Sequence, residues 1–264
     1  DTIWLDAGSY GHDTWEMISA TETAAVNLDK DSLTLIGKDS GATVIDPPGS
    51  KLLSGLYGIY ADTQTGLLVK NIGVTGALDG MRLINVDLST VTGDSASLCG
   101  NNGIFLNNGS DSNTLSGNMT ISNSWYGIYL RTSSNNTVSG NTANSNSNYG
   151  IYLQTNANGN TLSGNTANSN ADGGILVFST SNRNRLRGNT ANANPPFGIQ
   201  ISSADTNVVV QNDISGSDTG VWIVGSSRSN LISKNNITGN TISHVRNQGG
   251  IAQTLTRNWF GSSD

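Results

Sequence analysis

Short apolar triplets, each introduced by glycine, recur along the chain every 22 to 24 residues. Within a triplet the first and third residues are apolar and the middle one varies, as in Gly150-Ile151-Tyr152-Leu153. This period-two pattern predicts a short strand with one buried face, because the segments are too short for helices. The glycines that open the triplets are Gly58, Gly80, Gly103, Gly127, Gly150, Gly174, Gly198 and Gly220.

A second series of the form Asn-x-apolar-x-Gly-Asn recurs in step with the first. It begins at Asn113, Asn136, Asn160 and Asn184, and in a looser form at Asn207 and Asn230. A third, weaker series carries Ala143, Ala167, Ala191, Ile214 and Ile237. Three series with one common period predict three short strands per repeat.

No single repeat could bury its apolar face alone, whereas stacked repeats cover one another. Stacking aligns Ile128 with Ile151, and Leu115 with Val138. We therefore predict an all-β fold, a parallel β-helix of about eleven coils and roughly 50 Å in length. The expected organisation is one domain over residues 1–264, with irregular coils over 1–57, regular coils over 58–245 and a C-terminal end over 246–264.

The first part of the chain follows the repeat less closely. Strands are expected over residues 2–5, 32–36 and 42–46, where apolar residues alternate. The stretch from Ser9 to Asp29 is too long for a tight corner, so we expect a loop or a short capping helix there.

Glycine and asparagine have a structural explanation in such a fold. Corners between strands require residues that tolerate the left-handed backbone region, and Gly and Asn do so at the least cost. Asn side chains stacked from coil to coil can also pass amide hydrogen bonds along the rod. We interpret most of the asparagine as structural.

Composition and charge exclude some functions. The net charge is -6 with a pI of about 4.7, which argues against nucleic-acid binding, since that needs a basic surface. No apolar run is long enough to span a membrane. Cys99 is the single cysteine, so no internal disulfide can form, and we expect a buried thiol. Because the chain opens abruptly on a strand-like pattern, we expect it to be part of a longer secreted protein.

The segments DTIWLDAGSY, KDSLTLIGKDSGATVID, NTLSGNTANSN and RNWFGSSD together resemble the right-handed parallel β-helix repeat family. That family includes the NosD-like copper-accessory proteins, archaeal and bacterial cell-surface proteins, and a polysaccharide-cleaving disaggregatase. The resemblance implies a right-handed solenoid. It does not choose a function, because the same scaffold hosts polysaccharide lyases, epimerases and proteins without known activity.

The middle positions of the triplets are expected to point outward, because their neighbours point inward. They hold aromatic rings far more often than the 6% aromatic content of the chain predicts. We interpret this line as a binding surface for polysaccharide, which stacks its apolar faces on aromatic rings. A self-stabilising ladder, a contact with another protein and self-association are alternatives. The outward line is Tyr60, Arg82, Phe105, Tyr129, Tyr152, Leu176, Gln200 and Trp222.

Arginines gather in the segment NRNRLRGN, where Arg185 and Arg187 share an outward face and Arg183 lies at the adjoining corner. Guanidinium groups hold carboxylates and sulfates well, so these residues are candidates for binding an acidic polysaccharide. The alternative is pairing with Asp172 or Asp205 of neighbouring coils.

Signatures of catalysis are weak. Arg82, between Tyr60 and Phe105 and near Asp79, is the candidate for proton removal from a uronate by a lyase, with Ca²⁺ as a possible partner, although cation-π stacking explains it equally well. No metal site is expected, because Met, His and Cys are scattered, so copper handling is a remote alternative.

These observations lead to one main functional hypothesis and one alternative. The main hypothesis is a non-catalytic extracellular or cell-surface domain that contacts polysaccharide or other proteins through the outward line and needs no cofactor. The alternative is a polysaccharide-degrading enzyme, a lyase, a glycoside hydrolase or a disaggregatase type.

Overall fold

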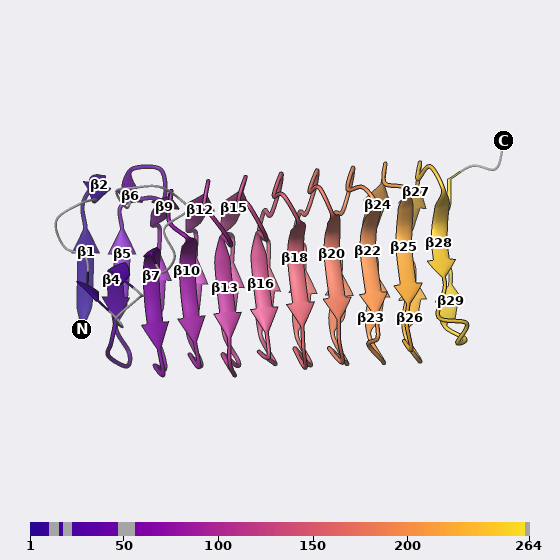
Figure 1. The fold of residues 1–264 in the computed structure, drawn as a ribbon, viewed down its shortest axis with the longest axis horizontal. Helices are drawn as coiled ribbons and strands as arrows, with labels where there is room; N and C mark the ends of the chain where they lie inside the picture. The colour runs from indigo at the N-terminus through magenta and orange to yellow at the C-terminus, as the bar shows by residue number, and fades with distance from the viewer. Residues whose placement is uncertain (11–15, 18–22, 47–55, 262–264) are drawn as a thin grey trace.

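The computed structural model describes residues 1–10, 16–17, 23–46 and 56–261, and shows a straight rod in which each coil stacks on the one before (Figure 1). The described residues contain strands, turns and no helix. Three sheets run along the rod, and the pairings between successive coils are parallel apart from that of β3 with β4. The chain is thus a right-handed parallel β-helix, as the repeats and the resemblance predict.

Sheet A has eleven strands. They are β1 (Thr2–Leu5), β5 (Thr34–Gly37), β8 (Leu68–Lys70), β11 (Thr90–Thr92), β14 (Thr114–Ser116), β17 (Thr137–Ser139), β19 (Thr161–Ser163), β21 (Arg185–Arg187), β23 (Val208–Val210), β26 (Leu231–Ser233) and β29 (Thr254–Thr256).

Sheet C also has eleven strands and contains the glycine-initiated triplets. They are β3 (Glu16–Met17), β4 (Thr23–Leu28), β7 (Leu56–Asp62), β10 (Asp79–Ile84), β13 (Ile104–Asn107), β16 (Ile128–Arg131), β18 (Tyr149–Gln154), β20 (Gly173–Phe178), β22 (Phe197–Ser202), β25 (Thr219–Val224) and β28 (Ser243–Asn247).

Sheet B lies between them in the chain and is interrupted. Its strands are β2 (Gly8–Tyr10), β6 (Thr43–Ile45), β9 (Gly73–Thr75), β12 (Ser95–Ser97), β15 (Met119–Ile121), and further along β24 (Asp213–Ser215) and β27 (Asn236–Thr238). In the middle of the rod only isolated bridges at Thr142, Thr166 and Thr190 remain. The third predicted strand of each repeat is therefore reduced to a bridge in these coils.

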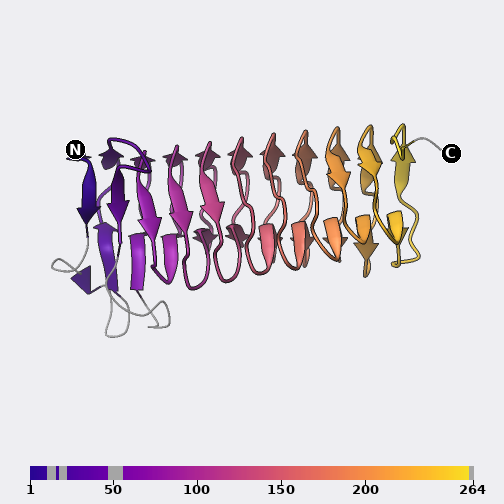
Figure 2. The same cartoon turned by 90° about the horizontal axis from the view of Figure 1, so that it is seen from above.

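The predicted count of eleven coils is slightly too high, because the rod has about eight turns. Seen from above, the strands of successive coils lie side by side along the rod (Figure 2). Near the N-terminus, the strands expected over 2–5, 32–36 and 42–46 correspond to β1, β5 and β6. The stretch from Ser9 to Asp29 ends in strand β4, while 11–15 and 18–22 lie outside the described residues.

The interior of the rod is a column of aliphatic side chains. Ile128, Ile151 and Ile175 occupy one register position in successive coils, and each is fully buried. The glycine before each triplet lies where the chain passes close to other coils. A Cβ on Gly150 would come within 2.8 Å of the Ala143 carbonyl oxygen and of the Ala167 Cβ. Lack of space, rather than a left-handed backbone, therefore explains this glycine.

Asparagine forms hydrogen-bonded columns inside the corners. The Asn165 side chain accepts a hydrogen bond from the Asn141 backbone N–H at 2.9 Å and donates to the Val138 carbonyl at 2.8 Å. One column continues through Asn118, Asn141, Asn165, Asn189, Asn212 and Asn235. Each of these residues is almost fully buried, so the predicted structural role of the asparagines is confirmed.

Candidate functional site

A groove of about 430 Å³ lies over the outer face of sheet C, across β10, β13 and β16. Three residues of the predicted outward line, Arg82, Phe105 and Tyr129, line it. The remaining lining residues are Asn101, Asn102, Asn107, Trp125, Tyr126, Arg131 and Gln154. Parallel register brings these residues together, because Arg82, Phe105 and Tyr129 occupy equivalent positions in three successive coils.

Arg82 is held at one end of the groove by a buried acid. Its Nη1 donates to the Asp79 Oδ2 at 2.9 Å, and the arginine side chain is 20% exposed. Asp79 also accepts hydrogen bonds from the Asn102 backbone N–H and Nδ2. Burial raises the pKa of Asp79, and the charge of Arg82 and its hydrogen bonds oppose this rise.

The Arg82 guanidinium also packs between aromatic rings. Its central carbon lies 4.8 Å from the Tyr57 ring centroid and 5.1 Å from that of Phe105. The stacking predicted for this residue is therefore present. An arginine side chain stays charged, and this one is paired with an acid, so Arg82 is not arranged as the proton acceptor that the lyase hypothesis required.

The aromatic line points away from the rod interior, as predicted, but its rings are not exposed. Phe105 and Tyr129 stack with centroids 4.6 Å apart, and Tyr129 and Tyr152 with centroids 5.0 Å apart. Only 5%, 8% and 6% of Phe105, Tyr129 and Tyr152 are accessible. The expectation of exposed ring faces is wrong, because rings one coil apart cover each other's faces.

A second row of rings covers the edge of the first. Tyr126 and Tyr149 stack with centroids 5.6 Å apart, and Tyr126 meets Tyr129 edge to face at 5.0 Å. Burial raises the pKa of Tyr129 to about 12 and also raises that of Tyr152. Both phenols are therefore protonated at neutral pH. The self-stabilising ladder describes these rings better than a platform for sugars.

The exposed side of the groove is formed by residues outside the predicted line. Trp125 is 49% exposed, and Arg131 is exposed at the end of β16. Gln154 accepts a hydrogen bond from the Tyr129 hydroxyl. Sequence reasoning missed Trp125 and Arg131 because they precede and follow a triplet. A tryptophan at a corner of so polar a repeat was the available signal for Trp125.

Two amide oxygens in the groove are buried without a hydrogen-bond donor. They are the Oδ1 atoms of Asn102 and Asn107, whose residues are 4% and 8% exposed. Both residues line the groove. Because each of these two oxygens is itself almost inaccessible, a molecule bound in the groove would not contact it directly.

The other predicted binding residues lie elsewhere. Tyr60 belongs to a separate cluster with Tyr57, and their ring centroids are 5.6 Å apart. Trp222 is half-buried far along sheet C, where it contacts Phe197 edge to face and donates to Gln248. Trp222 nevertheless packs against the cluster that contains Phe105, whereas Tyr60 lies outside that cluster.

Arg185 and Arg187 are exposed on β21 of sheet A, a different sheet from the groove. Arg187 Nε donates to the Gln211 Oε1 at 2.9 Å. Within the described part of the chain neither arginine forms an ion pair, so the alternative of pairing with Asp172 or Asp205 is wrong. Arg183 lies at the corner before β21 with a left-handed backbone.

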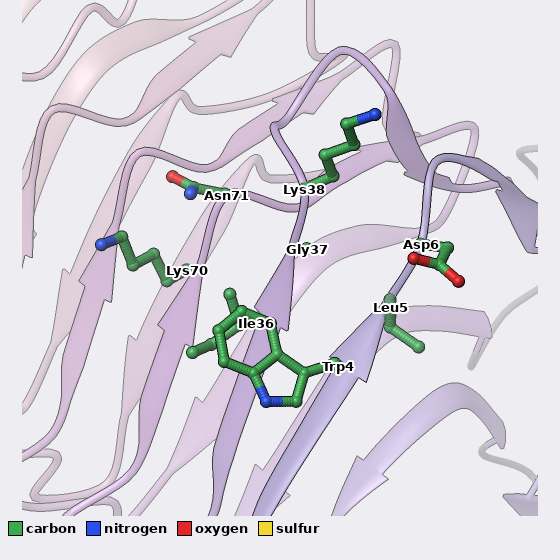
Figure 3. A pocket seen from close by; sticks show the side chains of 8 residues that line it. All are labelled: Trp4, Leu5, Asp6, Ile36, Gly37, Lys38, Lys70 and Asn71. Carbon is green, nitrogen blue, oxygen red and sulfur yellow. The ribbon is translucent and has the colours of Figure 1, made fainter.

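A second hollow of about 390 Å³ lies near the N-terminal end of sheet A (Figure 3). Trp4, which is 72% exposed, pairs in register with Ile36, and the Lys38 and Lys70 side chains extend from the same wall (Figure 3). Asp6 also lines this hollow. Sequence reasoning assigned no role to these residues.

Metal ligands do not gather in the described residues, where no three His, Cys, Asp or Glu side chains come together. Cys99 is buried and is not in a disulfide. Over the same residues no helix has the length and apolar character needed to cross a membrane.

The chain belongs to the family described as the right handed beta helix region, which matches residues 39–191. Residues 156–264 also match the family described as periplasmic copper-binding protein (NosD). That second segment contains His244 as its one residue among Cys, His and Met. These donors do not fit a copper site of the soft-ligand type. A sequence comparison with curated proteins gives no match.

Several solved structures share the fold of this chain. The A-module of a mannuronan C-5 epimerase from Azotobacter vinelandii superposes with a TM-score of 0.85 at 14% identity, over 100% of this chain and 91% of that chain. An alginate lyase from Paenibacillus sp. gives 0.75 at 17% identity, over 95% and 92%. A DFA-IIIase from Arthrobacter chlorophenolicus gives 0.68 at 12% identity, over 99% and 76%. At these identities the likeness concerns the fold.

Proposed function

We propose that this chain is a non-catalytic domain that works outside the cytoplasm and binds an acidic polysaccharide in the groove on sheet C. The observation that carries the proposal is a groove that combines the half-exposed Trp125 with the exposed Arg131 and the partly exposed Arg82. The carboxylate of an acidic sugar accepts from Arg131 at the exposed side of the groove, and the sugar hydroxyls bond to the accessible polar groups that line it.

The exposed tryptophan, Trp125, adds an apolar contact for the sugar. Trp125 lies on the groove with half of its surface accessible, so it can stack on the apolar face of a sugar. This role replaces the one predicted for Phe105, Tyr129 and Tyr152, whose faces cover one another. In this arrangement the aromatic ladder serves as a rigid floor for the site.

Binding without chemistry suits the groove better than catalysis. Its lining contains no Asp, Glu, His or Lys. Tyr129 is protonated at neutral pH because burial raises its pKa to about 12. A lyase or epimerase needs a group that removes the proton next to the carboxylate, and the lining offers none in the required state. Full-length similarity to carbohydrate-active enzymes keeps a polysaccharide enzyme as the second candidate.

Affinity electrophoresis in gels containing alginate or dextran tests the proposal. We expect the wild-type domain to be retarded by alginate and not by dextran. Trp125→Ala and Arg131→Ser should each weaken this retardation, whereas Trp259→Ala should not, since Trp259 is an exposed tryptophan outside the groove. Unchanged retardation of both groove variants would refute the site.

The same protein and alginate samples separate binding from catalysis. Unsaturated ends are followed by ultraviolet absorbance, new reducing ends by a colorimetric assay and epimerised residues by proton NMR. The proposal expects no change in any of the three. A product that forms with wild type and not with Asp79→Asn/Arg82→Gln would establish the enzyme instead.

A further inference from the structure

None of the eleven strands of sheet A contains an acidic residue, although the chain carries 19 Asp and Glu against 13 Lys and Arg. The middle residue of each regular strand is buried and its two neighbours face outward, as in β19, where Leu162 is inside. One outer wall of an acidic protein is thus free of carboxylates along its strands. This distribution attracts anions to that wall.

Basic side chains lie at both ends of one file of residues on this wall, a file being the residues that occupy the same register position in successive strands. The register aligns Trp4, Lys70 and Arg187 in a single file that runs through the coils between them. Five strand spacings separate Lys70 from Arg187, which corresponds to about 24 Å. Lys38 joins Lys70 at the first end, beside the exposed Trp4 (Figure 3). Arg185 joins Arg187 on β21 at the other end.

Hydroxyl groups fill the file between the cations. Thr92, Ser116, Ser139 and Ser163 hold the intervening positions, and all four are partly accessible. The Ser116 hydroxyl donates to the Thr92 hydroxyl at 2.9 Å. Such a row offers short-range donors and acceptors with no charge, which suits the hydroxyl groups of a carbohydrate.

The arginines at the far end are available to a ligand. In the described residues Arg187 makes one side-chain hydrogen bond, through Nε to Gln211, and this holds the guanidinium in place. Two acids at the corner before sheet A are engaged elsewhere, since Asp87 and Asp111 accept the backbone N–H groups of Asp111 and Ser134, and Asp6 lies at the first end, in the hollow. Asp87 and Asp111 are oriented by the backbone of the next coil and not by the arginines.

We infer that the outer wall of sheet A is a second binding face for acidic polysaccharide, which lies lengthwise from the Trp4 hollow to Arg185 and Arg187. Carboxylates or sulfates of the polymer pair with the cations at the two ends, and its hydroxyls meet the Thr and Ser row. Together with the groove on sheet C, this face makes one rod able to bridge two polymer chains. The bridging rests on the proposed function of the groove, whereas binding to sheet A does not.

The test uses the whole domain with alginate oligomers graded by length, followed by calorimetry, and with long alginate, followed by turbidity. The variant Arg185→Thr/Arg187→Ser introduces the residues found at the same register one coil earlier, Thr161 and Ser163, so the fold is preserved. Lys38→Thr/Lys70→Thr removes the cations at the other end, and Arg246→Ser removes an exposed charge on β28 of sheet C, outside the groove, as a control.

We expect wild type to bind long oligomers at two sites and to make long alginate turbid. The Arg185/Arg187 and Lys38/Lys70 variants should weaken one site about tenfold or more, which is the loss typical of charge-assisted pairs. The turbidity of long alginate should fall together with the affinity of that site. Oligomers shorter than the span between the cations should gain little from the second face. The control should behave as wild type.

Three outcomes separate the two proposals. If the sheet A variants keep both sites, or if the control loses binding equally, the inference about sheet A is overturned. If Trp125→Ala and Arg131→Ser change nothing while the sheet A variants abolish all binding, the groove proposal fails and the sheet A face stands. If wild type shows one site that only the groove variants remove, the groove stands and the bridging role is refuted.

Discussion

The coils after Asn113 and the coil that precedes them use the same three buried corner positions but fill them differently. In the later coils these positions hold mainly asparagine, whereas the earlier coil has Ser89, Asp94 and Cys99. An asparagine carries both an acceptor and a donor, so it links the coils on both sides. Asp94 accepts from the Ile72 N–H at 2.8 Å, but its Oδ2 has no partner.

The difference shows what the amide contributes. Asn118, the next member of the column, donates through Nδ2 to the Val91 carbonyl at 2.9 Å. An ionised Asp94 cannot donate in this way, and burial raises its pKa to about 7, while the backbone N–H donors of Ile72 and Thr92 oppose the rise. Repeated asparagine thus continues the hydrogen-bonded column from coil to coil without introducing charge. The column ends at Asp94, whose protonation depends on pH.

Breaking the column in its middle should have the largest effect. Asn165→Ala removes the bonds to Val138 and Asn189 and leaves the Asn141 N–H without its acceptor inside the rod. We expect a loss of about 4–6 kcal/mol in the free energy of unfolding, measured by urea denaturation. Asn168→Ala, in the partly accessible outer row, should cost clearly less. Equal losses would show that burial of the amide is not what matters.

The end of the column should show a pH dependence. The folded pKa of Asp94, about 7, lies above its ordinary value of 3.8, so the carboxyl favours the folded state fully at low pH. Stability should fall as the pH rises from about 4 to about 7 and then level off, a change of up to about 4 kcal/mol. Thermal unfolding across this range measures it.

Asp94→Asn is the matched variant for this prediction, because it extends the column by one amide. It should remove that part of the pH dependence and raise stability at pH 8, while stability at pH 4 changes little. A slope that survives the substitution would assign it to another group.

The outer aromatic column is expected to contribute less than an interior break. Tyr152→Ala removes a ring that is 6% exposed and stacks on Tyr129. We expect a loss of about 3 kcal/mol, again by urea denaturation. Tyr152→Phe keeps the ring and should cost little. If Tyr152→Ala left stability unchanged, the ladder would not stabilise the coils.

The smallest effect on stability, and the clearest on binding, is expected at the exposed rim of the groove. Trp125→Ala should change the free energy of unfolding by well under 1 kcal/mol but weaken alginate binding about tenfold. Calorimetry and denaturation on the same protein measure the two quantities. A large loss of stability with intact binding would reverse the assignments of Trp125 and Tyr152.

Much of the fold could be predicted because it repeats. The positions of Ile128, Ile151 and Ile175, the strands that carry them and the buried asparagines follow from one period read along the chain. The candidate site could be predicted only in part. Arg82, Phe105 and Tyr129 do line the groove, but Trp125, Arg131, Asn102 and Asn107 lie outside the apolar triplets and were not singled out.

The sequence by itself determined the stacking, because repeats of 22 to 24 residues with alternating apolar positions bury their apolar faces only when they stack on one another. Only the tertiary structure decided which outward side chains remain accessible. Rings that repeat at every coil lie one strand spacing apart and cover one another's faces, so regularity itself removed Tyr129 and Tyr152 from the surface. Trp125, which does not repeat, stays exposed for the same reason.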